Sequence, residues 1–299
     1  MRLRPELAVA SVAAFWGSIG LIVREVPEPA TVIVFARVAV ASVGLGLWMR
    51  YRRPRKRDEP GLFAHQPVRS GLQGVILACH WVALFAAFQR APVGTVLLVT
   101  YVAPVLVALV APRLLGERAQ PAVLAALGLA VLGSLLVLGP GASGAPATGI
   151  ALALIAAALL AVLIVNAKML SKFHDGVRLA FLQETVATAT LLPVVAIDND
   201  GWPSAASLGW LLVLGLVHTA AALVIYFQAL AQMPATSAGV LAYLEPAAGV
   251  LFAWWVLSEQ PSPATVAGGL LIMVAGLLVV RAGGDAGPTV TAAVAGNEP

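Results

Sequence analysis

The sequence has little charge: only 11% of its 299 residues are Asp, Glu, Lys or Arg, whereas about 25% is usual for a soluble domain. Hydrophobic residues make up 60%, which excludes a soluble globular enzyme. The single cysteine, Cys79, excludes an intramolecular disulfide. The chain also lacks a Gly-x-x-x-x-Gly-Lys-Ser/Thr motif, which excludes a nucleotide-driven pump. The composition therefore indicates a membrane protein, and we expect no cofactor.

Long apolar runs, separated by Pro, Gly or charged residues, make up most of the chain. A transmembrane helix needs about 20 such residues, and ten runs satisfy this length. The expected spans are 5–23, 30–49, 69–89, 92–112, 121–139, 148–168, 177–197, 206–229, 235–257 and 262–281. We expect an all-α membrane protein in which 1–140 and 147–281 each hold five helices. Small residues dominate 282–299, which we expect to be a disordered cytoplasmic tail.

Basic residues are distributed unevenly between the two sides of such a bundle. Fifteen of the 18 Lys and Arg residues lie in alternate connections, at 2–4, 50–69, 113–118, 168–178 and 281. Arg24 and Arg90 lie on the other side, and Arg37 lies inside the second span. Cytoplasmic connections carry the excess of Lys and Arg, so we expect both termini in the cytoplasm and the protein in the cytoplasmic (inner) membrane. The basic clusters then determine topology and imply no nucleic-acid partner.

The two halves of the chain repeat at an offset of 142 residues. The matched pairs are Phe85 and Phe227, Pro92 and Pro234, Tyr101 and Tyr243, Pro104 and Pro246, Glu117 and Glu259, and Pro121 and Pro263. The fourth span thus corresponds to the ninth, and an odd number of crossings reverses its direction. This five-plus-five inverted repeat is the plan of secondary transporters, which bind substrate near the midplane and alternate access between the two sides.

Two motifs of the second half carry a family resemblance. They are Tyr243-Leu244-Glu245-Pro246 and the glycine-rich run 268–276, and the first half matches through Pro104 and 115–118. Over about 5–281 the chain resembles EamA-type transporters of the drug/metabolite transporter superfamily. The resemblance implies movement of amino acids, other metabolites or toxic compounds, most often outward, and no enzymatic activity. The chain departs from it at Ala103, which stands where the second half has Glu245.

Ionisable residues inside the spans are costly and are therefore functional candidates. Glu245 lies near the midplane, where we expect it to couple transport to protons. Alternatively, its protonated carboxyl bonds to a backbone carbonyl that Pro246 leaves without a donor. Arg37 and Glu184 are expected at similar depths, with Arg37 binding a substrate carboxylate and Glu184 serving as amine partner or proton site. Alternatively, these two side chains pair with each other or with the backbone.

Two histidines lie midway along their spans. We expect His80 to contact substrate and His218 to take part in proton coupling. Each histidine could instead bond to a neighbouring helix. Cys79 and His80 are adjacent and their side chains diverge by about 100° on a helix, so we expect no metal site.

Aromatic residues at mid-depth are expected to surround a partly apolar substrate, although they could instead be ordinary core or lipid-facing residues. This group comprises Trp16, Trp81, Tyr101 and Tyr243. Pro104 and Pro246 occupy matched positions and are expected to act as hinges. The fifth and tenth spans lack charge, His and aromatic residues over 122–138 and 264–280. We therefore expect the cavity to lie between the other eight spans.

These features predict a secondary transporter that moves an amino acid or a related amphipathic metabolite by alternating access. Proton-coupled export is the leading hypothesis. An uncoupled facilitator or an importer would use the same fold. A remote alternative is an intramembrane hydrolase, because Gly141-Ala142-Ser143-Gly144 matches a Gly-x-Ser-Gly pattern and His218 is a conceivable base. That serine lies in a connection rather than at a buried helix start. We expect a monomer or a weak homodimer.

The topology can be tested by cysteine-accessibility scanning on a Cys79→Ser background. Because basic residues favour the cytoplasmic side, cysteines placed at 52–58 should react only from inside, and those at 141–146 only from outside. The opposite labelling pattern would refute the orientation.

Overall fold

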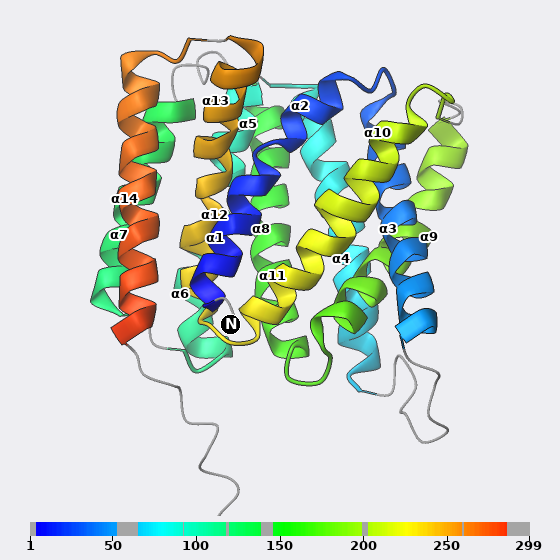
Figure 1. The fold of residues 1–299 in the computed structure, drawn as a ribbon, viewed down its shortest axis with the longest axis horizontal. Coiled ribbons are helices and arrows are strands. Elements are labelled where there is room, and N and C mark those ends of the chain that lie inside the picture. The colour runs from blue at the N-terminus through cyan, green and yellow to red at the C-terminus, as the bar shows by residue number, and fades with distance from the viewer. Residues whose placement is uncertain are drawn as a thin grey trace, which may run out of the picture.

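The chain folds into a bundle of helices (Figure 1), here described from a computed structural model. The structure describes residues 4–52, 65–91, 93–117, 120–138, 146–198, 203–258 and 260–285. The helices of the first half are α1 (Pro5–Trp16), α2 (Ile19–Arg24), α3 (Ala30–Arg52), α4 (Pro67–Phe88), α5 (Val93–Thr100), α6 (Ala103–Leu114) and α7 (Pro121–Leu138).

The second half repeats this order. Its helices are α8 (Ala147–Leu170), α9 (Gly176–Asp198), α10 (Leu208–Val213), the π-helix η2 (Leu214–Ala221), α11 (Ala222–Leu230), α12 (Ala235–Ala242), α13 (Leu244–Leu257) and α14 (Pro263–Asp285). Because α14 continues to Asp285, the first four residues of the expected disordered tail are helical, which corrects the boundary at 282. The remainder of that tail, from 286 onward, lies outside the described residues.

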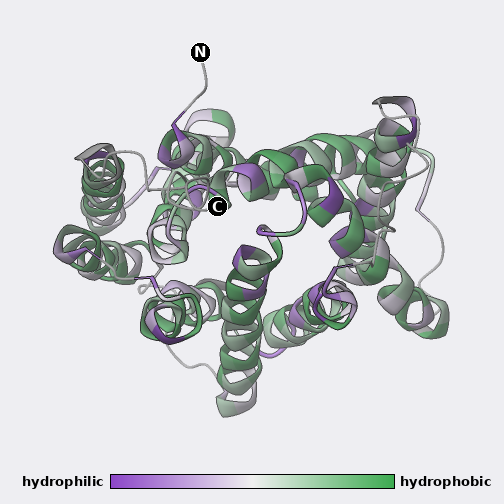
Figure 2. Cartoon of the chain, turned by 90° about the horizontal axis from the view of Figure 1, so that it is seen from below, coloured by the Kyte–Doolittle hydropathy of each residue, from purple (hydrophilic) through white to green (hydrophobic). Residues whose placement is uncertain are grey.

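Nine segments within the described part of the chain are long and apolar enough to cross a membrane. The tenth expected span is the shorter apolar helix at Pro121–Val137. At 1.5 Å per residue, the 18 residues of α7 reach about 27 Å, close to the thickness of the hydrocarbon core. Hydrophobic residues also predominate along most helices (Figure 2). The protein is therefore an all-α membrane protein, as the sequence predicts.

The helix contacts obey the symmetry of a five-plus-five repeat. Three pairs of equivalent spans pack against each other, namely α3 with α9, α6 with α12, and α7 with α14. The contact of α4 with α8 is matched by that of α11 with α1, because the third and sixth spans correspond to the eighth and first. The contact of α4 with α9 is likewise matched by that of η2 with α3. The helix contacts thus agree with the repeat of motifs in the sequence.

Backbone conformation at one turn repeats as well. Gly116 has φ 68° and Ser258, 142 residues later, has φ 57°. Both residues follow the end of their span, and both adopt the left-handed region that residues other than glycine rarely enter. The same turn therefore closes the fourth and ninth spans, although one half lacks the glycine.

Four spans are interrupted near the middle of the bundle. The first breaks at Gly17 and Ser18, the fourth at Tyr101 and Val102, and the ninth at Tyr243, while the eighth contains η2. Pro104 and Pro246 lie in the first turn of the second segments of the fourth and ninth spans, where a missing amide donor is tolerated. Broken helices of this kind expose backbone groups in the interior of transporters.

Helices α7 and α14 lie side by side at one edge of the bundle (Figure 1). Two glycines allow their backbones to meet. A Cβ atom added at Gly133 would lie 2.6 Å from the Gly268 carbonyl oxygen, and one added at Gly268 would lie 2.5 Å from that of Gly133. In contrast, a Cβ atom added at Gly20, Gly128 or Gly269 would meet nothing within 4 Å, so these glycines do not mark close contacts.

The substitution Gly133→Ala should therefore destabilise the contact between α7 and α14 by about 1–3 kcal/mol, the usual cost of overpacking. Gly128→Ala on the same helix is the matched control and should change stability by less than about 0.5 kcal/mol. Thermal unfolding in detergent measures both effects. Equal melting temperatures for the two variants would contradict the close packing.

Candidate functional site

Arg37 lies on α3, about eight residues into the second span, and is half-buried. Its Nε donates a hydrogen bond of 3.1 Å to Oγ1 of Thr219 in η2. Its Cζ lies 5.1 Å from the ring centroid of Trp81 on α4, a cation–π distance. The guanidinium thus contacts two helices besides its own.

Two carboxylates act on this guanidinium from different helices of the second half. Glu184 comes from α9 and Glu245 from α13, and both interact electrostatically with Arg37. Glu184 is 1% exposed, whereas Glu245 is half-buried. The structure therefore brings together the three ionisable residues that the sequence singled out from the second, seventh and ninth spans.

Tyr101 and Tyr243 meet where the fourth and ninth spans break. Their ring centroids lie 5.5 Å apart, and the Tyr243 hydroxyl donates to the backbone carbonyl of Tyr101. The Tyr101 hydroxyl in turn donates to the carboxylate of Glu245. These contacts connect the Glu245 carboxylate to the helix breaks of the fourth and ninth spans, one in each half.

His218 lies in η2 and is held by the first span. Its ring stacks on Phe15 at 4.1 Å, and its Nε2 lies 3.0 Å from Oγ of Ser18 at the break after α1. Trp16 Nε1 donates a 2.8 Å hydrogen bond to the His218 backbone carbonyl. A π-helix inserts one extra residue per turn and is often found at functional sites. Here it presents His218 to α1 and Thr219 to Arg37.

His80 and Trp81 point in different directions, as adjacent residues of a helix must. His80 Nδ1 lies 2.9 Å from the Ala156 carbonyl oxygen on α8, which agrees with the alternative of a bond to a neighbouring helix. Trp81 lies against Arg37 and also lines a pocket of about 160 Å³ between α3, α4 and α9. Phe85, Val34 and Leu191 line the same pocket, so Trp81 separates an apolar recess from the charged group.

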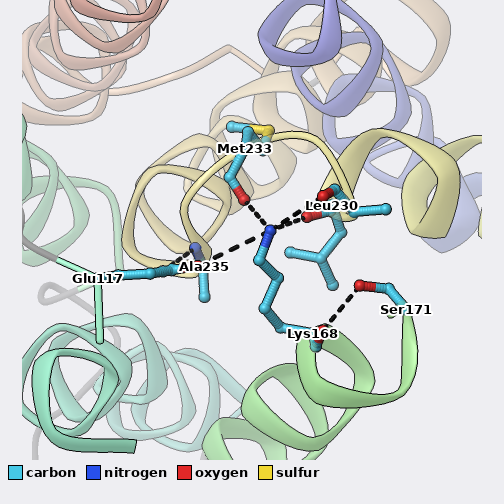
Figure 3. A network of polar contacts seen from close by, with 7 residues as sticks. Glu117, Lys168, Ser171, Leu230, Met233 and Ala235 are labelled. Carbon is cyan, nitrogen blue, oxygen red and sulfur yellow. Dashed lines mark hydrogen bonds and ion pairs between the residues drawn. The ribbon is translucent and has the colours of Figure 1, made fainter. Parts of the chain in front are cut away.

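A second polar network lies at the side of the bundle where α1 begins, here called the N-terminal side. Figure 3 shows Lys168 of α8 directed at the loop between α11 and α12. Its Nζ donates to the carbonyls of Leu230 and Met233 at 2.7 Å and to that of Ala231 at 3.2 Å.

Glu117 completes this network from the turn after α6. Its Oε1 lies 3.8 Å from the Lys168 Nζ, and its Oε2 accepts a 2.7 Å hydrogen bond from the Ala235 N–H at the start of α12. A cation at the end of α11 and an anion at the start of α12 both complement the helix dipoles. Glu117 of the first half and Lys168 of the second thus both bind the loop between α11 and α12.

On the side of the bundle opposite the N-terminal side, different hydrogen bonds join the two halves. Glu28 Oε1 accepts hydrogen bonds from the Ser204 N–H at 2.8 Å and from the Ser207 hydroxyl at 2.7 Å. These hydrogen bonds, that of the Ser204 N–H foremost, lower the pKa of Glu28 below its usual value. Among the described residues, the contact of a lysine with three loop carbonyls lies on the N-terminal side.

Several of these partners were not among the residues chosen from the sequence. Thr219, Ser18 and Phe15 are small or apolar residues whose importance depends on breaks in the first and eighth spans, which no local pattern announces. Lys168 and Glu117 lie near span ends, where the sequence marks the first only as a topology signal and the second only as part of the repeat. The buried amides at positions 73, 166 and 183 were detectable, because polar side chains are rare in apolar spans.

No group of three or more His, Cys, Asp or Glu side chains suited to a metal ion occurs within the described ranges. Ser143, the serine of the hydrolase alternative, lies outside those ranges.

Comparisons with known proteins agree with this architecture. Residues 3–139 and 147–281 each match the EamA-like transporter family. The chain is 28% identical to the pseudopaline exporter CntI of Pseudomonas aeruginosa (strain UCBPP-PA14), with 93% of this chain and 97% of the relative covered. It is 29% identical to a "Probable terminal-alkyne amino-acid exporter" of Streptantibioticus cattleyicolor, with 82% of each covered. A solved crystal structure shares the fold with a TM-score of 0.79 at 20% identity, covering 92% of this chain and 98% of that one.

An inverted pair of five-helix halves, with broken spans meeting at buried charges, defines a membrane transport protein. The chain belongs to the EamA-like transporter family. Members of this family are transporters and not enzymes, so the hydrolase alternative based on Ser143 and His218 is wrong.

The contacts of Lys168 predict that this residue holds the loop between α11 and α12 closed. Lys168→Met removes a cation that contacts three carbonyls, so the loop between α11 and α12 should open more often. A cysteine at Met233, which is 2% exposed, should then react about tenfold faster with a thiol reagent on a Cys79→Ser background. Lys172→Met, at an exposed position nearby, is the matched control. Equal reactivity in the two variants would exclude a closing role.

Proposed function

We propose that the protein exports a small amphipathic metabolite, of the amino-acid type, across the cytoplasmic membrane in exchange for protons. Arg37 binds the carboxylate of the substrate, and the carboxylates of Glu184 and Glu245 bind its ammonium group or protons in alternation. The observation that carries this proposal is the interaction of one guanidinium with two carboxylates from different helices.

The charge balance of these three residues supports exchange. With both carboxylates ionised the group has a net charge of −1, which one proton neutralises. A zwitterionic substrate adds no net charge, but its ammonium group pairs with a carboxylate while its carboxylate pairs with Arg37. Net charge in the membrane interior is costly, so the carboxylates favour either a proton or a cationic group. Because both ligands use the same oxygens, binding of one displaces the other. That competition is what antiport requires.

Glu245 is the carboxylate best placed to couple its protonation to movement. Its partner Tyr101 lies at the break of the fourth span, and Glu245 itself lies just after the break of the ninth. The Tyr243 hydroxyl joins the two breaks. A change of charge at Glu245 therefore alters contacts of both broken spans, for which Pro104 and Pro246 serve as hinges.

The aromatic residues suit the apolar part of such a substrate. Trp81 offers a ring face next to the guanidinium and also lines the recess between α3, α4 and α9, in which most of the other residues are apolar. The ring of Trp16 lies 5.5 Å from the ring of Tyr226 on α11. His80 and His218 contribute less directly, since each is bonded or stacked against a neighbouring helix.

Export as the direction is supported by two relatives, one named a pseudopaline exporter and the other a "Probable terminal-alkyne amino-acid exporter". We place the N-terminal side in the cytoplasm because the basic connections lie there. The lysine network then closes the cytoplasmic side. An uncoupled facilitator or an importer of the same fold remains the second candidate, since both would use the same two gates.

The coupling role can be tested with Glu245→Gln in proteoliposomes. Glutamine keeps the shape and cannot titrate, so transport driven by a pH gradient should fall at least about tenfold while exchange of substrate persists. Glu25→Gln, at an exposed position at the end of α2, is the control and should behave as the wild type. If Glu245→Gln keeps the wild-type rate and pH dependence, Glu245 is structural and the proton site moves to Glu184 or the histidines.

A further inference from the structure

Three buried amide side chains form a chain of hydrogen bonds that ends at Glu184. Asn166 Nδ2 on α8 donates to Gln73 Oε1 on α4 at 2.8 Å, and Gln73 Nε2 donates to Gln183 Oε1 on α9 at 2.7 Å. Gln183 Nε2 then donates to Glu184 Oε1 at 3.0 Å. Gln73 and Gln183 are 1% and 4% exposed. The chain joins three helices from both halves of the protein.

Two backbone carbonyls determine the direction in which these amide groups donate. Asn166 Nδ2 also donates to the backbone carbonyl of Arg69 at 3.1 Å, and Gln73 Nε2 to that of Leu163 at 3.3 Å. A carbonyl oxygen can only accept, so the NH₂ groups of Asn166 and Gln73 must face these carbonyls. Gln183 must then accept through its oxygen and donate through its nitrogen. As a result, Glu184 Oε1 receives an N–H donor whether or not the carboxyl carries a proton.

The other oxygen of the same carboxyl is left without such a donor. Glu184 Oε2 is buried and has no hydrogen-bond partner among the described residues. In a neutral carboxyl group the carbonyl oxygen is a better acceptor than the hydroxyl oxygen, so the N–H of Gln183 favours the carbonyl at Oε1 and the proton on Oε2. The amide chain thereby makes the two oxygens of one carboxyl different.

We propose that Asn166, Gln73 and Gln183 are positioning residues that occupy Oε1 of Glu184 and leave Oε2 to bind, in turn, a proton and the ammonium group of the substrate. This inference rests on the proposed exchange function and assigns one atom to it. No covalent bond to the substrate forms. The proton leaves Oε2 for water, and an N–H of the arriving ammonium group replaces it.

The surroundings of Glu184 contain few competing charges. Arg37 on α3 is the charged residue that acts on it. The side chains that α4 and α8 contribute here are the uncharged amides of the hydrogen-bonded chain. Helix α11 carries no charged residue. Its one titratable side chain, Tyr226, packs against Trp16. Arg37 and the amide of Gln183 therefore define the electrostatic environment of this carboxyl, which makes the effect of removing the amide separable.

A purely architectural amide chain would bind α4, α8 and α9 together without affecting protonation. The substitution Gln183→Leu distinguishes the two roles, because it preserves the size of the side chain and removes the donor to Oε1. The Glu184 carboxylate then loses one hydrogen bond, and its proton should be held more tightly. We expect the pH of half-maximal transport to rise by about 0.5–1 units.

Infrared difference spectroscopy of the full-length protein in liposomes reports protonation without any substrate. The carboxyl band that disappears in Glu184→Gln belongs to Glu184, and its pH midpoint should rise in Gln183→Leu and, to a lesser extent, in Gln73→Leu. Gln232→Leu, at an exposed amide, is the matched control and should leave the midpoint unchanged. Thermal unfolding identifies variants that are destabilised.

The outcomes separate the two proposals. A raised midpoint in folded Gln183→Leu or Gln73→Leu supports the positioning role, even if a panel of amino acids is not transported and the exchange function fails. Lower melting temperatures with an unchanged midpoint in both variants would overturn the positioning role and leave an architectural one. The absence of a titrating Glu184 band in the wild type would overturn it as well.

Discussion

A guanidinium inside the membrane is the constraint on which the centre of this protein depends. An isolated Arg at mid-membrane depth is costly, and Arg37 is accompanied by a hydroxyl, an aromatic face and two carboxylates. These partners come from the third, seventh, eighth and ninth spans. The spans must therefore keep a particular arrangement around Arg37, and the breaks in the first, fourth, eighth and ninth spans all lie beside it or its partners.

The scaffold is symmetric, whereas the chemistry is not. Helix contacts, the left-handed turns at Gly116 and Ser258 and the paired Tyr101 and Tyr243 all follow the inverted repeat. Glu245, in contrast, has Ala103 as its counterpart, and the polar contacts of Lys168 on one side differ from those of Glu28 on the other. Symmetry lets the two halves exchange conformations at similar energy, which alternating access needs. The unpaired residues give the two sides of the membrane different properties.

Much of the fold could be predicted from the sequence because hydrophobic length and repeated prolines are local signals. The ten apolar runs correspond to the observed spans, and the repeat at 142 residues predicted the inverted architecture. The site was harder to predict. Arg37, Glu184 and Glu245 stood out as charges in apolar spans, but their convergence depends on tertiary packing. Thr219 could not be chosen, because its role requires the π-helix that turns it towards Arg37.

The central claim, that Arg37 and its two carboxylates bind an amino-acid-like substrate in exchange for protons, is tested most directly by counterflow. Labelled amino acids and related metabolites would be offered to proteoliposomes with and without a pH gradient, for the wild type and for Arg37→Gln. We predict that at least one zwitterionic compound exchanges, that a pH gradient drives its accumulation, and that Arg37→Gln abolishes both. Exchange that is independent of Arg37, or unaffected by the gradient, would contradict the account.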